Sequence, residues 1–159
     1  MAKLMPEEIQ IRTPYDLIGG AEIVRQVVDR FYELMDEDAA YAELRAMHAS
    51  DLAPMRQSLA GFLTAWLGGP RAWFEARPGV CMMSMHRRMT IPEAAASQWA
   101  DAMHRAVIEF VPDRRMAEKI TGAGFACAYD GERPCALTGR AERRRITAVS
   151  TRNIVIAVP

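Results

Sequence analysis

The sequence lacks a hydrophobic run long enough to cross a membrane, and it lacks an excess of either charge. Its 20 Lys and Arg residues balance 20 Asp and Glu residues, so the net charge gives no indication of nucleic acid or an anionic membrane as a partner. The polar start MAKLMPEEIQIRTP does not have the pattern of a secretory signal peptide. We therefore expect a cytoplasmic protein.

Cysteine is scarce, and the motifs of several common sites are missing. Cys81, Cys127 and Cys135 are an odd number without the spacing of metal ligands, which fits reduced thiols. Neither GxGxxG nor a P-loop occurs for phosphate, and neither HExxH nor a CxxC pair occurs for zinc. A nucleophilic pair of Cys81 and His86 is also disfavoured, because residues five apart on a helix do not face each other.

What the sequence does have is enough apolar residues for one sizeable core. Its 159 residues match a single domain, and 50% of them are hydrophobic. The 11 methionines matter for the kind of core, because this soft side chain fills irregular apolar space, including space around a bulky guest molecule.

The first part of the chain has helical periodicity interrupted by glycine. Residues 13–16, TPYD, offer a cap, a proline at the first helical position and an acid in the first turn, and Gly19-Gly20 ends this helix early. From residue 21 to 35 apolar residues, including Phe31, recur at helical spacing. Tyr32 lies at the edge of the same inward face.

A further helix is predicted over about residues 52–67. The sequence GGP at 68–70 stops it, because glycine adopts a left-handed C-terminal cap and proline prevents the helix from resuming. Residues 70–80 are expected to form a loop with at most a turn of helix. The predicted buried stripe of the 52–67 helix consists of Met55, Leu59, Phe62 and Trp66.

The stretch MMSMHRRMTI, residues 82–91, places one histidine among methionines. On a helix Met82, His86 and Met89 would lie on the same face. Residues 90–93, TIPE, resemble a capping box that begins a new helix. The inward stripe predicted for that helix consists of Trp99, Met103, Ala106, Val107 and Phe110.

The last third of the chain changes character. Asp113 is expected to cap a short helix that runs to about Thr121 and ends at Gly122. Residues 122–145 have no helical period, and the β-branched end, ITAVSTRNIVIAVP, suits either a strand or a disordered tail. The sequence thus predicts an N-terminal extension over 1–13, an all-α domain over 14–121 and an irregular tail over 122–159.

Four polar residues fall at candidate inward positions: Tyr32, His48, His86 and Trp99. Each has an ordinary interpretation when taken alone. A single histidine or tryptophan on an apolar face is more often a core residue, Tyr32 can direct its hydroxyl to solvent, and His48 in a loop is more often solvated.

Six segments taken together resemble the group II truncated haemoglobins, in that family's order and spacing. They are YDLIGG (15–20), RFYELMD (30–36), MHASDL (47–52), FLTAWLGGP (62–70), HRRMTI (86–91) and QWADAMHRAV (98–107). His86, Met89 and Ile91 match the family's proximal-histidine pattern, and Trp99 matches its hallmark tryptophan. The resemblance covers about residues 14–120 and implies a two-over-two helical sandwich around a haem.

The resemblance also implies roles for individual residues. His86 would be the axial ligand of haem b, which would be held non-covalently because the sequence has no CxxCH. On the opposite face Tyr32 would offer its O–H and Trp99 its N–H to a ligand on the iron, next to Phe31. His48 would either offer an N–H to the ligand or bond Tyr32. The other expected haem contacts are Met82, Met85, Met89, Met55, Leu59, Phe62, Trp66 and Arg87.

The sequence departs from the family around the proximal histidine. Pro78-Gly79-Val80 stands where relatives have Gly-His-Pro, and Met83 and Met85 stand where they have arginines. Arg87 and Arg88 instead follow His86. One of them would take over the contact with a haem propionate, or both belong to a solvated face.

The expected function is the binding of O2 or another small diatomic ligand at the haem iron. Storage or transport, detoxification of peroxide or nitric oxide, and gas sensing share one pocket, so the sequence leaves catalysis open. The alternative is a haem-free globin-like sensor or interaction module. The sequence also leaves open a reductase partner and the choice between monomer and homodimer.

Overall fold

The computed structural model describes residues 12–80, 85–86 and 88–123. Within these ranges every regular element is a helix, which confirms the all-α prediction, and no helix is both long and apolar enough to cross a membrane. The expectations for Met82, Arg87, the three cysteines and the tail beyond residue 123 lie outside the described residues. The elements in chain order are α1 Pro14–Ile18, α2 Gly20–Glu37, η1 Ala39–Tyr41, α3 Ala42–Ala46, α4 Ala53–Trp66, α5 Ala72–Glu75, α7 Glu93–Phe110 and α8 Arg114–Ala123.

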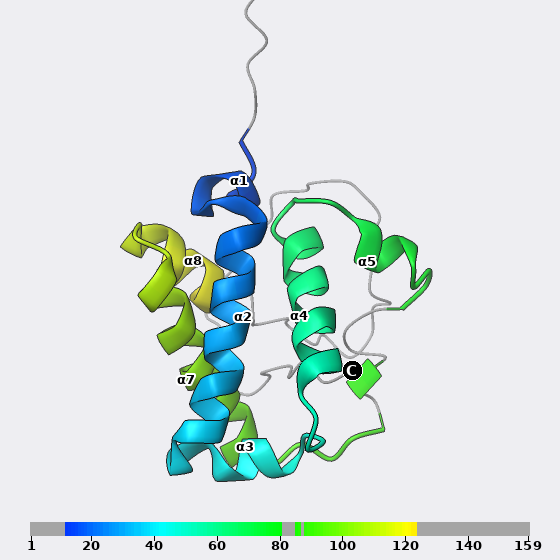
Figure 1. The fold of residues 1–159 in the computed structure, drawn as a ribbon, viewed down its shortest axis with the longest axis vertical. Coiled ribbons are helices and arrows are strands. Elements are labelled where there is room, and N and C mark those ends of the chain that lie inside the picture. Colours follow the sequence, from blue (N-terminus) through cyan, green and yellow to red (C-terminus); the bar gives the residue numbers. More distant parts are fainter. Residues whose placement is uncertain (1–11, 81–84, 87, 124–159) are drawn as a thin grey trace, which may run out of the picture.

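The four longest helices form two pairs, α2 with α4 and α7 with α8. Helix α2 packs against both α4 and α7, so it joins the two pairs. Figure 1 shows α2 (blue) between α4 (teal) and the α7–α8 pair (yellow-green and yellow), with α1 at one end and α3 at the other. This is the two-over-two arrangement that the sequence predicts.

Local signals fix the start of the fold as predicted. Asp16 and Thr13 form a reciprocal capping box, in which Thr13 Oγ1 accepts from the Asp16 N–H at 3.2 Å and Asp16 Oδ2 accepts from the Thr13 N–H at 3.0 Å. Gly19 then ends α1 in the left-handed region with φ of 113°. These two signals explain why α1 is short and why α2 begins immediately after it.

Two predicted helix boundaries are wrong. The N-cap of α7 is Pro92 and makes no side-chain capping hydrogen bond, so Thr90 is not the cap of a capping box. A residue that precedes proline is disfavoured in the helical region, which keeps Ile91 out of the helix. Pro92 is itself extended, with ψ of 147°, so the helix begins at Glu93. At the other boundary, Asp113 caps α8 as predicted, but the helix continues through Gly122 to Ala123.

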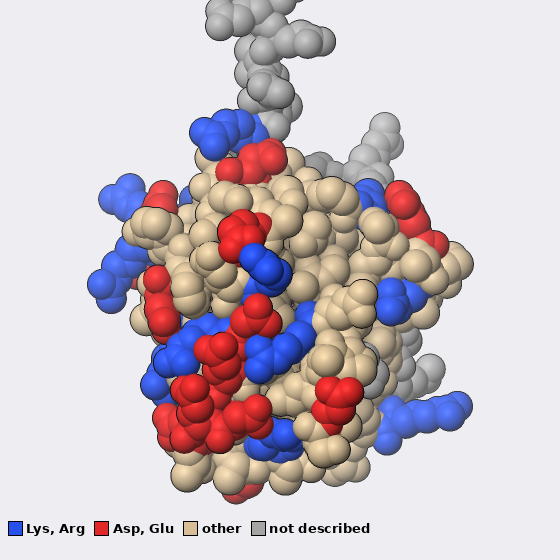
Figure 2. All heavy atoms as spheres, in the orientation of Figure 1, with Lys and Arg blue, Asp and Glu red and all other residues tan. Residues whose placement is uncertain are grey.

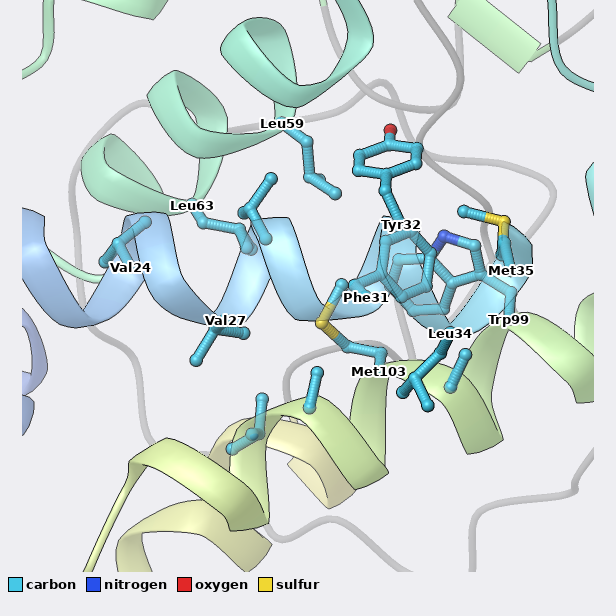
Figure 3. Packing of buried hydrophobic residues seen from close by; sticks show 14 of the residues in the cluster. Val24, Val27, Phe31, Tyr32, Leu34, Met35, Leu59, Leu63, Trp99 and Met103 are labelled. Carbon is cyan, nitrogen blue, oxygen red and sulfur yellow. The ribbon is translucent and has the colours of Figure 1, made fainter. Parts of the chain in front are cut away.

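The buried stripe of α4 also differs from the prediction. Met55, Leu59 and Leu63 are buried on this helix, whereas Phe62 and Trp66 are half-buried. Figure 3 shows Leu59 and Leu63 pointing from α4 toward α2. The Phe62 ring lies instead against α5, with its centroid 5.3 Å from that of Trp73 and 5.9 Å from that of Phe74.

Candidate functional site

The four residues predicted to face a ligand lie together in a cluster of rings. Phe31 and Tyr32 are consecutive on α2, and their ring centroids are 5.0 Å apart in an edge-to-face arrangement. The Trp99 ring of α7 meets Phe31 at 5.6 Å, and the His48 ring meets Tyr32 at 5.9 Å. Figure 3 shows Phe31 and Trp99 next to each other, with the Tyr32 ring beside them and directed toward α4. We call these four residues the ring cluster.

Tyr32 is fully buried, and its hydroxyl points away from α2 (Figure 3). This oxygen has no hydrogen-bond partner among the described residues. Burial raises the pKa of Tyr32, and the nearby charge of Arg56 opposes that rise. The hydroxyl therefore keeps its proton at neutral pH and is a hydrogen-bond donor inside an apolar cluster.

Arg56 belongs to the site, although sequence reasoning missed it. Its guanidinium carbon lies 5.5 Å from the centroid of the Tyr32 ring. The same side chain joins α4 to α2, because its Nη1 donates to the Asp29 carbonyl oxygen at 2.9 Å and to Asp29 Oδ1 at 3.0 Å. In the sequence an arginine beside Met55 looks like an ordinary solvated position, and only the approach of α2 and α4 gives it a role.

His48 follows α3 and is buried, with 8% of its surface exposed, so the interpretation as a solvated loop residue is wrong. Its Nδ1 lies 2.8 Å from the Leu44 carbonyl oxygen, while its Nε2 has no partner among the described residues. Burial lowers the pKa of His48; the hydrogen bond with Leu44 opposes this, and the charge of Arg45 adds to it. His48 is therefore neutral at neutral pH.

A second residue that sequence reasoning missed is Gln98, directly before Trp99 on α7. Its Oε1 accepts from the Leu44 N–H at 2.9 Å. Leu44 thus connects α7 to His48, because its carbonyl binds the histidine and its N–H binds Gln98. An exposed-looking glutamine on a helix carries no sequence signal for such a contact.

The residues predicted on the other side of the site are less fully described. His86 is buried, with 6% exposed, and its carbonyl oxygen accepts from the Met89 N–H at 2.9 Å. Met85 and Met89 are half-buried, and Met89 packs against the core. The described residues contain no group of three or more His, Cys, Asp or Glu side chains that would hold a bare metal ion.

These residues fit a haem. An iron held by one protein imidazole would need its remaining ligands from a macrocycle, and His86 could supply a buried imidazole. Met55 and Leu59 supply an apolar wall on α4. The Tyr32 hydroxyl and His48 Nε2 are two buried polar atoms without partners in the described part of the chain, as a pocket for a small polar ligand requires.

The helical sandwich and the ring cluster place this chain among the globins. The family model for bacterial-like globins matches residues 13–124. The Group 2 truncated hemoglobin YjbI of Bacillus subtilis is 32% identical over 94 residues, which cover 59% of this chain and 68% of that protein. The chain therefore belongs to the bacterial-like globin family, and its resemblance to group II truncated haemoglobins is confirmed.

Solved structures agree with this assignment. The group II 2-on-2 haemoglobin of Agrobacterium tumefaciens superposes with a TM-score of 0.69 at 32% identity, covering 75% of this chain and 91% of its own. The cold-adapted truncated haemoglobin of Pseudoalteromonas haloplanktis gives a TM-score of 0.66 at 30% identity, covering 70% of this chain and 90% of its own.

Proposed function

We propose that this chain binds haem b non-covalently through His86 and binds O2 or another small ligand at the iron. The observation that carries the proposal is a pair of buried polar atoms, Tyr32 Oη and His48 Nε2, for which the described part of the chain provides no hydrogen-bond partner. Leaving such an atom unpaired costs about 1–3 kcal/mol, so it is retained more readily where a ligand satisfies it. Family membership supports the same cofactor.

Different residues of this chain would hold the haem and contact the ligand. Bound haem would supply the iron and an open coordination position. His86 would hold the iron by a ring nitrogen, and Met85 and Met89 would pack the neighbouring apolar surface with their flexible side chains. On the ligand side Tyr32 would donate its hydroxyl hydrogen, while Phe31 and Trp99 would exclude water around it.

The experiment that tests this is a titration of the purified full-length chain with haemin. We expect a Soret band that saturates at one haemin per chain. His86→Gly should lose the native spectrum and recover it when imidazole is added. The matched control is His104→Gly, because His104 is exposed on α7 and bonds only to Thr121 among the described contacts.

Two results would contradict the proposal in different ways, and a third would show that the His86 variant does not test it. No stoichiometric haemin binding would show that the chain is a haem-free member of the family. Spectra unchanged in His86→Gly would assign the iron to another ligand. Equal loss in His104→Gly would indicate general damage rather than removal of a ligand.

A further inference from the structure

His48 has only one way to arrange its ring hydrogens in this structure. Its Nδ1 lies 2.8 Å from the Leu44 carbonyl oxygen, and a carbonyl oxygen can only accept a hydrogen bond, so Nδ1 carries a hydrogen. The neutral imidazole has one N–H, and this contact uses it. His48 Nε2 therefore has a lone pair and is an acceptor, not a donor.

The partner of His48 is itself fixed. Leu44 is fully buried, and its N–H donates to Gln98 Oε1 at 2.9 Å. Gln98 thereby anchors α3 to α7 at the residue whose carbonyl orients His48. We expect this anchor to keep the Nδ1–H tautomer in place, which makes Gln98 a positioning residue.

Tyr32 complements His48 in the ring cluster. Its hydroxyl is a buried donor without an acceptor among the described residues, and its ring lies 5.9 Å from that of His48, centroid to centroid. The two residues therefore offer a ligand one donor and one acceptor. O2, carbon monoxide and nitric oxide can use the donor, but they have no hydrogen to give to the acceptor.

We infer that this site is built for small protic ligands of the type H–X, of which hydrogen peroxide is a biological example, and that His48 Nε2 takes their proton. In this step an O–H bond of the peroxide breaks, its electron pair stays on oxygen, and the proton forms an N–H bond at Nε2. The hydroperoxide anion keeps the hydrogen bond from Tyr32. The inference rests on the haem site proposed above and selects peroxide chemistry over gas storage.

The first test reads the tautomer directly and needs no turnover. The full-length chain contains three histidines, so imidazole nitrogen NMR resolves each ring, with His48→Gln giving the assignment. The measurement is made on the purified chain and repeated after loading with haemin, reduction and addition of carbon monoxide. We expect a hydrogen on Nδ1 and none on Nε2 at pH 7, and a hydrogen on Nε2 would overturn the inference.

The second test uses hydrogen cyanide, which also loses a proton when it binds a ferric haem. In His48→Leu we expect cyanide association to slow by at least about tenfold, since a positioned base contributes factors of this order or more. Association of carbon monoxide with the ferrous protein should change by less than about threefold, because no proton is transferred. His104→Leu is the matched control and should leave both rates at their original values.

Gln98 provides a third variant pair. Gln98→Leu removes the acceptor for the Leu44 N–H and should slow cyanide association, whereas Gln98→Glu keeps an acceptor oxygen and should restore it. The NMR tautomer should become mixed only in Gln98→Leu. Equal cyanide rates in all three Gln98 proteins would contradict the positioning role.

The outcomes separate this inference from the proposed function. If haemin does not bind the chain, both fail. If haemin binds with a normal Soret band but His48→Leu leaves the cyanide rate unchanged, or slows cyanide and carbon monoxide equally, only the inference about His48 fails.

Discussion

Tyr32 and His48 each bury a polar atom that no described residue hydrogen bonds. Such atoms lower the stability of the folded chain relative to an apolar side chain of the same shape. Phe31 does not relieve this, since its ring meets Tyr32 and Trp99 in edge-to-face contacts. At the scale of single residues, therefore, the two polar atoms lower the stability of the folded chain but are available to hydrogen bond with a ligand.

Tyr32→Phe tests whether the hydroxyl lowers stability and holds the ligand. It keeps the ring contacts and removes the unpaired hydroxyl, so we expect the haem-free chain to gain about 1 kcal/mol in free energy of unfolding by urea. In the haem-loaded protein the same change should speed O2 release by about fivefold, because one donor is lost. Both are measured on the same purified protein.

Tyr41→Phe is the matched control. The Tyr41 hydroxyl donates to Asp101 at 2.5 Å and accepts from Arg105 at 2.7 Å, so its removal should destabilise the chain by about 1 kcal/mol. If both substitutions destabilise to the same extent, the Tyr32 hydroxyl forms a hydrogen bond in the folded chain and the expected gain is wrong.

The lowered pKa of His48 gives a pH dependence with a definite sign. The unfolded chain binds a proton at His48 near pH 6.5, but the folded chain, where burial lowers the pKa, does not. The unfolded state then holds more protons, so the free energy of unfolding should fall as the pH drops through about 6.5. Urea unfolding of the full-length chain between pH 5.5 and 7.5 measures this slope.

His48→Gln should flatten the slope, whereas His104→Gln, on the exposed side of α7, should leave it as in the original chain. Arg45 is the charged residue whose field reinforces the lowered pKa, and Arg56 lies over the neighbouring Tyr32 ring. An unchanged slope in His48→Gln would mean that the folded chain takes up a proton at His48 as readily as the unfolded chain does.

At the scale of elements, sequence reasoning succeeded where the signal is local. The cap at Thr13, the glycines that separate α1 from α2 and the Asp113 cap of α8 act within a few residues. The stripe of α4 was harder, because Phe62 and Leu63 both continue the periodicity from Met55 and Leu59. Which of them is buried against α2 depends on where α5 lies, and periodicity does not contain that information.

In the site, too, sequence motifs predicted some residues, whereas contacts that depend on helix packing were missed. The positions of Tyr32, His48 and Trp99 were predicted from motifs in order along the chain, and the structure brings their rings together. The contacts of Gln98 with Leu44 and of Arg56 with Asp29 were not predicted, because they join residues 54 and 27 positions apart. In the sequence Gln98 and Arg56 look like ordinary polar residues of a helix, and only the packing of the helices brings them to their partners.

Gly69 shows how closely α1 approaches the end of α4. A Cβ at this position would lie 2.8 Å from Tyr15 Cγ and 2.9 Å from the Thr64 carbonyl oxygen, and the Tyr15 N–H donates to the Leu67 carbonyl oxygen. Because a backbone atom is among the obstructions, Gly69→Ala should destabilise the chain by about 1–3 kcal/mol, measured by urea unfolding.

Gly122→Ala is the control for that substitution. Nothing lies within 4 Å of a Cβ at Gly122 in α8, so alanine should stabilise the chain by up to about 1 kcal/mol through its higher helix propensity. Equal effects of the two substitutions would mean that α1 is not packed against α4 as closely as the structure has it.

At the scale of the whole molecule, ion pairs join neighbouring helices but contribute little to the stability of the fold. Arg30 on α2 bonds to Glu109 on α7 at 3.0 Å, and Arg105 on α7 bonds to Asp38 at 3.0 Å. Figure 2 shows basic and acidic groups intermixed on this face. Since these pairs are partly exposed to solvent, each contributes little, and the apolar core between α2, α4 and α7 stabilises the sandwich.

A haem that binds only the folded sandwich should therefore act as part of its core. By mass action, haemin at about a thousand times its dissociation constant adds about 4 kcal/mol, which raises the thermal unfolding midpoint by about 10 °C for a chain of this size. In His86→Gly the increase should shrink, because the protein ligand to the iron is gone. His104→Gly should retain all of it. If haemin raises the midpoint of His86→Gly as much as that of the original chain, haemin stabilises the fold through apolar contacts alone and the axial role of His86 is wrong.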